Sequence, residues 1–368
     1  MRIGVITVPF NNNYGGYLQS YALMTVLKNM GHSPTIIMRR HNKRSIRLKS
    51  KLLFLIKNVV KTIKDGRRYP YILNQETFFK YRGKDMLSFV NQNIQPQTKY
   101  IYTTKDLQAE CKDSFDGYIV GSDQVWRPIY VKGFISNFFL DFVKDPSAKR
   151  ISYGASFGTS TPEYTDGEKS ICGHLLGKFD AVSVREKGAL EVIENFGWKV
   201  KNKQVVPDPT MLLPRTSYDK LIPTVNAQAK GRIFCYVLDK NETNIHVIEK
   251  MRQSLQKPIY EIADIQKGNA VLPSIETWLS AIRECDFVIT DSYHGTVFSI
   301  IFNKPFLVCV NKERGADRFV SLLETFGLEN HTSLCQSGTE EPIDWENVNR
   351  ILEEKRKEGL SFLEKALN

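Results

Sequence analysis

The first 38 residues, MRIGVITVPFNNNYGGYLQSYALMTVLKNMGHSPTIIM (1–38), predict how the chain folds. An apolar run at 2–8 is typical of a buried strand, and a polar, glycine-containing loop follows it. We expect a helix over 17–30, ended by Gly31, and a second strand over 35–38. Because strand, helix and strand in this order form a parallel βαβ unit, the sequence predicts a doubly wound α/β sheet.

Three further apolar runs continue this pattern. They are FDGYIVGSD (115–123), RISYGASFG (150–158) and FDAVSVRE (179–186), and each ends in small or polar residues. Buried parallel strands have continuous apolar runs, and ligands bind beyond their carboxyl ends. We therefore expect functional residues directly after these runs.

The chain is long enough for two domains. Four prolines interrupt the alternation: Pro207, Pro209, Pro214 and Pro223. We place an N-terminal α/β domain at 1–222, a C-terminal α/β domain at 223–343, and a final charged helix at 344–368 that returns to the first domain. The expected architecture is two Rossmann-like, doubly wound domains facing a cleft, where ligands commonly bind.

The composition is that of a folded protein without a membrane span. Of 368 residues, 42% are hydrophobic and 25% are charged, and no run approaches the ~20 apolar residues that cross a bilayer. Six cysteines are scattered without a close Cys-x-x-Cys pair, and the amino terminus resembles a strand more than a secretory signal. We expect a cytoplasmic protein with no disulfide framework, no metal site and no cofactor.

The formal net charge of +11 is concentrated in one segment. Residues 39–68 contain twelve Lys and Arg residues and one acid, so the remaining chain is neutral. Apolar residues from Leu48 to Ile63 recur at spacings of three and four, which predicts a basic amphipathic helix. This helix either lies on an anionic membrane, at the inner face, or packs on the core with a solvated basic edge. Nucleic acid is disfavoured, because no aromatic stacking pattern accompanies the charge.

Two of the loops after strands have two readings each. In NNNYGGYLQ (11–19), Gly15 and Gly16 either allow the backbone to approach a ligand at a helix start or form a tight turn. The segment has no third glycine and no Walker lysine, so it does not match a nucleotide-binding fingerprint. In GSDQVWRP (121–128), Asp123 and Gln124 suit sugar hydroxyls and Trp126 suits a pyranose face. Alternatively, Asp123 caps a helix and Trp126 belongs to the core.

Two more loops carry charge. Arg185, in SVREKGAL (183–190), offers a planar fork to phosphate or carboxylate, or begins a solvated helix. TDSYHGTVFSI (290–300) is the strongest signal, because His294 follows the buried strand CDFVIT where a ligand would bind. A histidine there can exchange a proton near neutral pH, and the helix start at Gly295 favours a phosphate. A structural histidine is the alternative.

Seven segments in this order resemble the polysaccharide pyruvyl transferase family. They are NYGGYLQ, GSDQVW, SYGASFG, SVRE, VVPDPTMLL (205–213), TDSYHGTVFSI and ERGADRF (313–319), and the resemblance spans about 4–328. It implies a GT-B-like pair of domains and transfer of the enolpyruvyl unit of phosphoenolpyruvate to a sugar diol. The product would be a pyruvate ketal in surface or exopolysaccharide biosynthesis, made on a sugar or lipid-linked oligosaccharide.

The resemblance also implies residue roles. The family's histidine falls on His294, the expected general acid/base, and its donor-contacting arginine falls on Arg185; we add Asp123 to the catalytic residues. Further expected donor contacts are Arg318, Ser292, Gly295, Thr296, Gly15 and Gly16. Expected acceptor contacts are Asn13, Gln19, Ser122, Gln124 and Trp126.

One departure keeps other functions open. Better-known members have an arginine two residues before this histidine, whereas this chain has Ser292-Tyr293-His294. Either Arg314 or Arg318 replaces that arginine, or the donor is not phosphoenolpyruvate. The rivals are a GT-B nucleotide-sugar glycosyltransferase, since one fold serves many donors, and a non-catalytic, membrane-associated binding protein.

Overall fold

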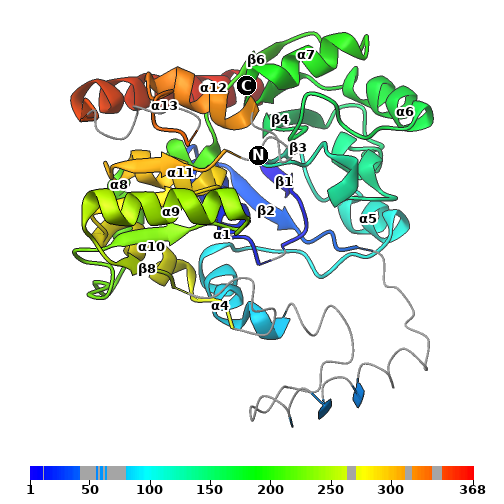
Figure 1. Ribbon diagram of the computed structural model, residues 1–368. Helices are drawn as coiled ribbons and strands as arrows, with labels where there is room; N and C mark the ends of the chain where they lie inside the picture. Colours follow the sequence, from blue (N-terminus) through cyan, green and yellow to red (C-terminus); the bar gives the residue numbers. More distant parts are fainter. Residues whose placement is uncertain are drawn as a thin grey trace.

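The computed structural model describes residues 1–10, 12–41, 55–56, 59–60, 63, 80–262, 271–310, 317–333 and 342–368. Most of the basic segment 39–68 and Arg314 lie outside these residues. The described chain forms two parallel sheets of six and four strands flanked by helices (Figure 1). The predicted α/β class with two doubly wound domains is confirmed.

The first sheet has the strand order β2-β1-β3-β4-β5-β6, and all neighbouring strands are parallel. Its strands are β1 (Arg2–Ile6), β2 (Ser33–Ile37), β3 (Gly117–Val120), β4 (Lys149–Ala155), β5 (Ala181–Val184) and β6 (Lys203–Val205). Because β2 and β3 lie on opposite sides of β1, the strand order reverses between β1 and β3. Ligands of open α/β sheets bind at such a switch point.

Helices and short 3₁₀ turns lie between these strands and after β6. The helices are α1 (Tyr14–Asn29), α4 (Lys84–Asn93), α5 (Thr104–Cys111), α6 (Asp166–Leu176), α7 (Lys187–Asn195) and α8 (Arg215–Asp219), and the 3₁₀ turns are η1 (Pro128–Tyr130), η2 (Ile135–Phe139) and η3 (Pro209–Met211). Local chemistry sets some boundaries: Thr165 and Glu168 form a reciprocal capping box that begins α6.

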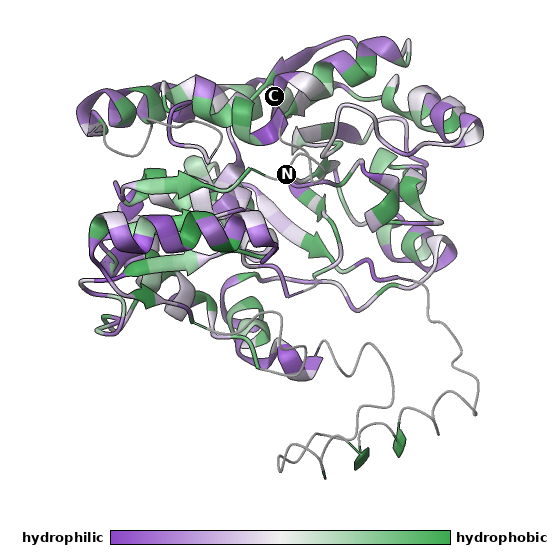
Figure 2. Ribbon diagram, viewed as in Figure 1, coloured by the Kyte–Doolittle hydropathy of each residue, from purple (hydrophilic) through white to green (hydrophobic). Residues whose placement is uncertain are grey.

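The second sheet has the order β10-β9-β7-β8, again parallel. Its strands are β7 (Ile233–Tyr236), β8 (Ile259–Tyr260), β9 (Phe287–Thr290) and β10 (Phe306–Val308). The helices that follow the first domain's α8 are α9 (Glu242–Leu255), α10 (Ile275–Glu284), α11 (Tyr293–Ile301), α12 (Asp317–Phe326) and α13 (Trp345–Leu367). In Figure 2, hydrophobic residues concentrate on the strands and hydrophilic ones on the outer helices.

Helix α1 joins the two domains. It is buried along most of its length, because it packs against both the first sheet and the second domain. The Tyr14 ring stacks on Trp278 of α10, with ring centroids 5.1 Å apart, and its hydroxyl donates to the Pro273 carbonyl at 2.9 Å. One apolar core therefore runs from the first sheet into the second domain.

Helix α13 packs on the first domain. Gly359 lies so close to β4 that a Cβ there would be 2.4 Å from the Tyr153 hydroxyl. Arg356 donates to the carbonyls of Met211 and Leu213, which follow β6. Figure 1 shows α12 and α13 together along the top of the molecule, across both domains.

The described part of the basic segment corrects one expectation. Arg39 is only 2% exposed and donates to Asn137 and to the Tyr102 carbonyl, so it belongs to the folded domain and not to a membrane-facing surface. Arg40 is half-buried and donates to the Phe10 carbonyl. Within the described ranges, no helix is long and apolar enough to cross a membrane.

Candidate active site

A buried carboxylate, Asp208, connects the carboxyl ends of the first sheet to the second domain. Its Oδ2 accepts hydrogen bonds from Ser122 Oγ, after β3, and from Arg185 Nη1, after β5, both at 3.0 Å. The same oxygen lies 3.5 Å from His294 Nε2 on α11. Asp208 thus brings together two residues that the sequence predicted for the site, Arg185 and His294.

Asp208 itself was missed by the sequence prediction. It lies in VVPDPTMLL, a segment quoted only for its family resemblance, and is completely buried. Burial alone would raise its pKa, but the charge and hydrogen bond of His294 and the charge of Arg185 hold the pKa well below its usual range. The carboxylate is therefore ionised. The sequence signal that could have identified Asp208 is a carboxylate directly after a strand and between two prolines.

Arg185 is the central cation of the site. Its guanidinium lies 4.1 Å over the Tyr293 ring, with Nη2 3.7 Å from Asp123 and Nε 3.6 Å from Glu186. Burial alone would lower its pKa, but Tyr293 and the surrounding carboxylates raise it. Among the described residues, Nε and Nη2 are buried without a hydrogen-bond partner. These two donors therefore face the carboxylates of Asp123 and Glu186 at ion-pair distance, without a hydrogen bond.

A second arginine, Arg318, lies near the first. Burial lowers the pKa of Arg318, and the positive charge of Arg185 lowers it further. Its charge also acts on Glu186, whose pKa is raised by burial and whose Oε1 accepts a 2.5 Å hydrogen bond from Ser156. Two close guanidinium groups favour a ligand with more than one negative charge.

His294 lies against the first domain. It is 5% exposed, and a Cβ on Gly15 would be 1.9 Å from its Nδ1. Only glycine at position 15 leaves room for the ring. Gly15 was predicted to allow close approach of a ligand, but in this structure it allows close approach of the histidine.

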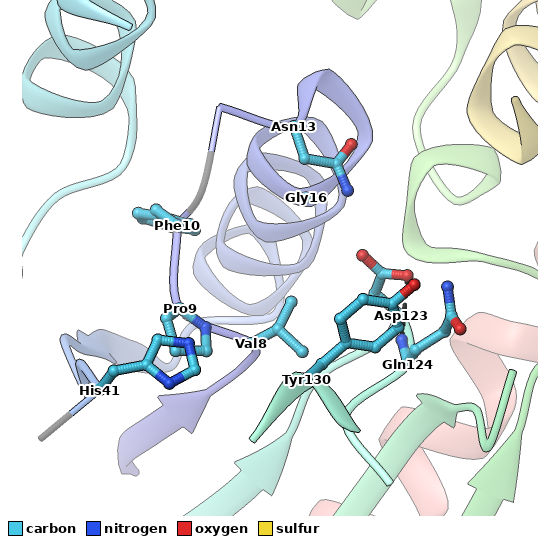
Figure 3. A pocket seen from close by; sticks show the side chains of 9 residues that line it. All are labelled: Val8, Pro9, Phe10, Asn13, Gly16, His41, Asp123, Gln124 and Tyr130. Carbon is cyan, nitrogen blue, oxygen red and sulfur yellow. Dashed lines mark hydrogen bonds between the residues drawn. The ribbon is translucent and has the colours of Figure 1, made fainter. Parts of the chain in front are cut away.

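A pocket of about 200 Å³ opens beside this cluster, at the switch point between β1 and β3. The residues that line it are Val8, Pro9, Phe10, Asn13, Gly16, His41, Asp123, Gln124 and Tyr130 (Figure 3). Figure 3 shows Asn13, at the start of α1, across from Asp123 and Gln124. Asp123 is shared, since it lines the pocket and faces Arg185. Tyr130 was not predicted and is 46% exposed.

Three predicted acceptor contacts are wrong. Trp126 is fully buried: its Nε1 donates to the Phe138 carbonyl and its ring stacks on Phe139. Gln19 is also fully buried, and its amide donates to Thr7 and to the Gly16 carbonyl. Ser122 is buried against Asp208. None of these side chains is exposed to a sugar.

The predicted phosphate cradle at Gly295 and Thr296 is also wrong. Helix α11 begins at Tyr293, earlier than expected, with Ser292 as its N-cap. Ser292 Oγ accepts from the Gly295 amide at 3.3 Å, and the Ser292 carbonyl accepts from the Thr296 amide at 3.0 Å. Both amides are therefore already bonded within the helix start. Among the described residues, no group of His, Cys, Asp and Glu could hold a metal ion.

Comparisons with known proteins identify the family and the fold. A family model for polysaccharide pyruvyl transferases matches residues 13–313. No protein in a search of curated proteins matches the chain. Similar solved structures include UDP-GlcNAc 2-epimerase from Methanocaldococcus jannaschii, with 11% identity, a TM-score of 0.51, and coverage of 96% of this chain and 92% of that one.

A candidate UDP-N-acetylglucosamine 2-epimerase from Listeria monocytogenes is similar too, with 10% identity, a TM-score of 0.50, and coverage of 98% and 90%. A glycosyltransferase from Streptomyces sp. SF2575 has 12% identity, a TM-score of 0.42, and coverage of 97% and 96%. At such identities the likeness to the two epimerase structures concerns the fold alone, which is GT-B-like.

Proposed function

Because this chain belongs to the polysaccharide pyruvyl transferase family, we propose that it transfers the enolpyruvyl unit of phosphoenolpyruvate to a sugar diol. The product is a pyruvate ketal in the biosynthesis of a surface polysaccharide or exopolysaccharide. The observation that carries the proposal is a pair of buried arginines, Arg185 and Arg318, of which Arg185 bonds the same Asp208 oxygen that lies 3.5 Å from His294. The donor has a phosphate and a carboxylate, and two guanidinium groups can bind both.

The position of Arg318 supports a proposal about the departure from the family pattern. The residue two places before His294 is Ser292, which caps α11 and cannot bind a phosphate as an arginine does. Arg318 begins α12 and acts electrostatically on Arg185 and Glu186. We assign Arg318 the role of the missing arginine, with Arg185 as the second donor contact.

The reaction needs one proton donor and one base. A proton adds to C3 of the enol, and a sugar hydroxyl attacks C2 as it loses its proton to the base. The second hydroxyl then attacks C2, the C2–O bond to phosphate breaks, and the last hydroxyl proton leaves with phosphate. His294 is the proposed acid/base, because a positioned histidine exchanges protons near neutral pH.

The pocket at the switch point is the proposed acceptor site. Asn13 and Gln124 offer amides and Asp123 a carboxylate to sugar hydroxyls, while the exposed Tyr130 offers an aromatic face to the ring. Asp123 lies 3.7 Å from Arg185, so an acceptor in this pocket is adjacent to the donor. Tyr130 takes the role first predicted for Trp126.

The test is sugar-dependent release of phosphate from phosphoenolpyruvate, followed by ³¹P NMR, with the ketal detected by mass spectrometry. Arg185→Lys should raise the KM for phosphoenolpyruvate, because one ammonium cannot replace a bidentate fork. Arg350→Lys is the matched control, because the Arg350 side chain is exposed on α13. Turnover of a UDP-sugar without reaction of phosphoenolpyruvate would support the glycosyltransferase instead, and binding of either donor without turnover would support a non-catalytic protein.

We also propose that the 39–68 segment attaches the protein to an anionic membrane, where lipid-linked acceptors are made. Its described residues Ile56, Val59, Val60 and Ile63 are helical, follow the i, i+3, i+4, i+7 spacing, and are 53%, 46%, 55% and 78% exposed. An exposed apolar face within a basic segment suits a lipid surface.

Vesicle sedimentation tests this attachment. The protein should bind vesicles that contain anionic lipid, less strongly as salt rises, and replacing Lys57, Lys61 and Lys64 by Glu should abolish binding, since each basic residue is worth ~1 kcal/mol there. The variant should keep its activity on a soluble acceptor. Equal binding by both proteins, or by neither, contradicts the proposal.

A further inference from the structure

We propose that Asp208 is a positioning residue: its carboxylate faces His294 Nε2 at 3.5 Å, keeps the ring proton on that nitrogen, which has no hydrogen-bond partner among the described residues, and so leaves Nδ1 as the nitrogen that exchanges protons. The assignment of the ring proton rests on the geometry around Asp208 and on its negative charge. Only the reaction at Nδ1 rests on the proposed function.

The Asp208 carboxylate is held in a fixed orientation. Its Oδ1 accepts from the Thr210 amide at 3.0 Å and from Thr210 Oγ1 at 2.7 Å. Its Oδ2 accepts from Ser122 and Arg185, both at 3.0 Å. Four donors from three segments therefore fix the oxygen that faces His294.

The charge state of Asp208 then decides the tautomer. Its pKa is held low although burial opposes this, so the carboxylate is an acceptor only. The nitrogen that faces an acceptor must carry the proton, and Nε2 lies 3.5 Å from Oδ2. In neutral His294 the proton is therefore on Nε2, and Nδ1 has a lone pair.

The other ring nitrogen, Nδ1, lies against Gly15 of the first domain, and the adjacent Gly16 lines the pocket. The Tyr293 ring is also close, with ring centroids 5.4 Å apart, and Arg185 bonds the Asp208 oxygen that faces Nε2. Nδ1 is thus the ring nitrogen turned away from Asp208, and the proposed proton exchange is assigned to it.

This arrangement assigns Asp208 a role in the reaction without contact to substrate. When the sugar O–H bond breaks and Nδ1–H forms, His294 becomes an imidazolium. The Asp208 carboxylate stabilises that cation, and the hydroxyl oxygen uses its electron pair to bond to C2 of the donor. The proton on Nε2 stays in place throughout.

The test is heteronuclear NMR of the full-length protein with ¹⁵N-labelled histidine, in which loss of a signal in His294→Ala assigns the ring. The parent should show the Nε2–H tautomer when neutral. Asp208→Asn removes the negative charge that faces Nε2, so the preference for Nε2–H should be lost and the Nδ1–H tautomer should appear. Ser122→Ala removes one donor to Oδ2 without changing the group that faces His294, so it should keep the parent tautomer.

An Nδ1–H tautomer in the parent overturns the proposal, even if Asp208→Asn fails to fold. So does an unchanged tautomer in folded Asp208→Asn. With phosphoenolpyruvate and a sugar, Asp208→Asn should lower kcat by roughly 10²- to 10⁴-fold. If the parent shows Nε2–H but no reaction with phosphoenolpyruvate, the proposed function fails and the positioning role stands.

Discussion

Helices α1 and α11 begin in similar ways, yet their first turns do different things. Each follows a buried parallel strand, α1 after β1 and α11 after β9. Each is capped by a polar side chain: Asn13 accepts from the Gly15 amide at 3.1 Å, and Ser292 from the Gly295 amide at 3.3 Å. The start of α1 borders an open pocket, whereas α11 is buried from Tyr293 onward. The two starts meet where His294 packs on Gly15.

The difference shows what each domain contributes to the candidate site. The first domain has the open pocket, where we propose that the sugar binds, and the second has the buried His294, which we propose as the acid/base. The charged residues between them, Arg185 and Asp208, belong to the first domain but face the second. The candidate site is therefore built from both domains.

The strongest test of this division removes the histidine. His294→Ala should lower turnover by ~10²- to 10⁴-fold, because a positioned acid/base contributes about that much, while the fold survives. Turnover is measured as phosphate release, and circular dichroism checks folding. His246→Ala, exposed on α9, should keep the parent rate. Near-parent turnover in His294→Ala would show that α11 has no part in the chemistry.

A second test compares adjacent glycines at the start of α1. A Cβ on Gly15 would overlap the His294 ring at 1.9 Å, whereas a Cβ on Gly16 would have no neighbour closer than 3.8 Å. Gly15→Ala should destabilise the protein by about 1–3 kcal/mol through overpacking and reduce turnover with it. Thermal unfolding measures the first effect. Gly16→Ala should be tolerated; equal losses in both variants would contradict the contact.

The smallest expected effect is on the pocket side. Tyr130→Ala should raise the acceptor KM about two- to tenfold and leave the KM for the donor unchanged, since an aromatic contact is worth ~0.5–1.5 kcal/mol. Tyr130→Phe should retain most of the affinity. Ile129→Ala is the control, because Ile129 is 60% exposed on the same turn but does not line the pocket. A matching loss in the Ile129 variant would argue against a sugar-binding face on Tyr130.

The order of strands and helices was largely predictable, because buried parallel strands leave apolar runs. The exceptions are instructive. Strand β6 (Lys203–Val205) is a partly exposed edge strand and has no such run, so Asp208 after it was overlooked. Helix α12 was not predicted, although Phe319, Leu322, Leu323 and Phe326 recur on one face.

Side-chain direction after a strand was less predictable. Asp123 has a left-handed backbone with φ of 76° and lines the pocket although it is only 6% exposed, whereas its neighbours Ser122 and Trp126 are fully buried and do not line the pocket. Trp126 is held by the Phe138 carbonyl of η2, a contact that no local pattern indicates. The sequence located the loops of the site but not which of their side chains are exposed to a ligand.

The shared helix α1 has a consequence for synthesis on the ribosome. The Tyr14 hydroxyl bonds a carbonyl 259 residues further along the chain. At about 5–20 residues per second, roughly 13–50 s pass before that partner is made. During this time the apolar surface of α1 that the second domain later covers is exposed to other nascent chains. A fragment that ends at the domain boundary keeps that surface exposed permanently, and it should require a chaperone to stay in solution.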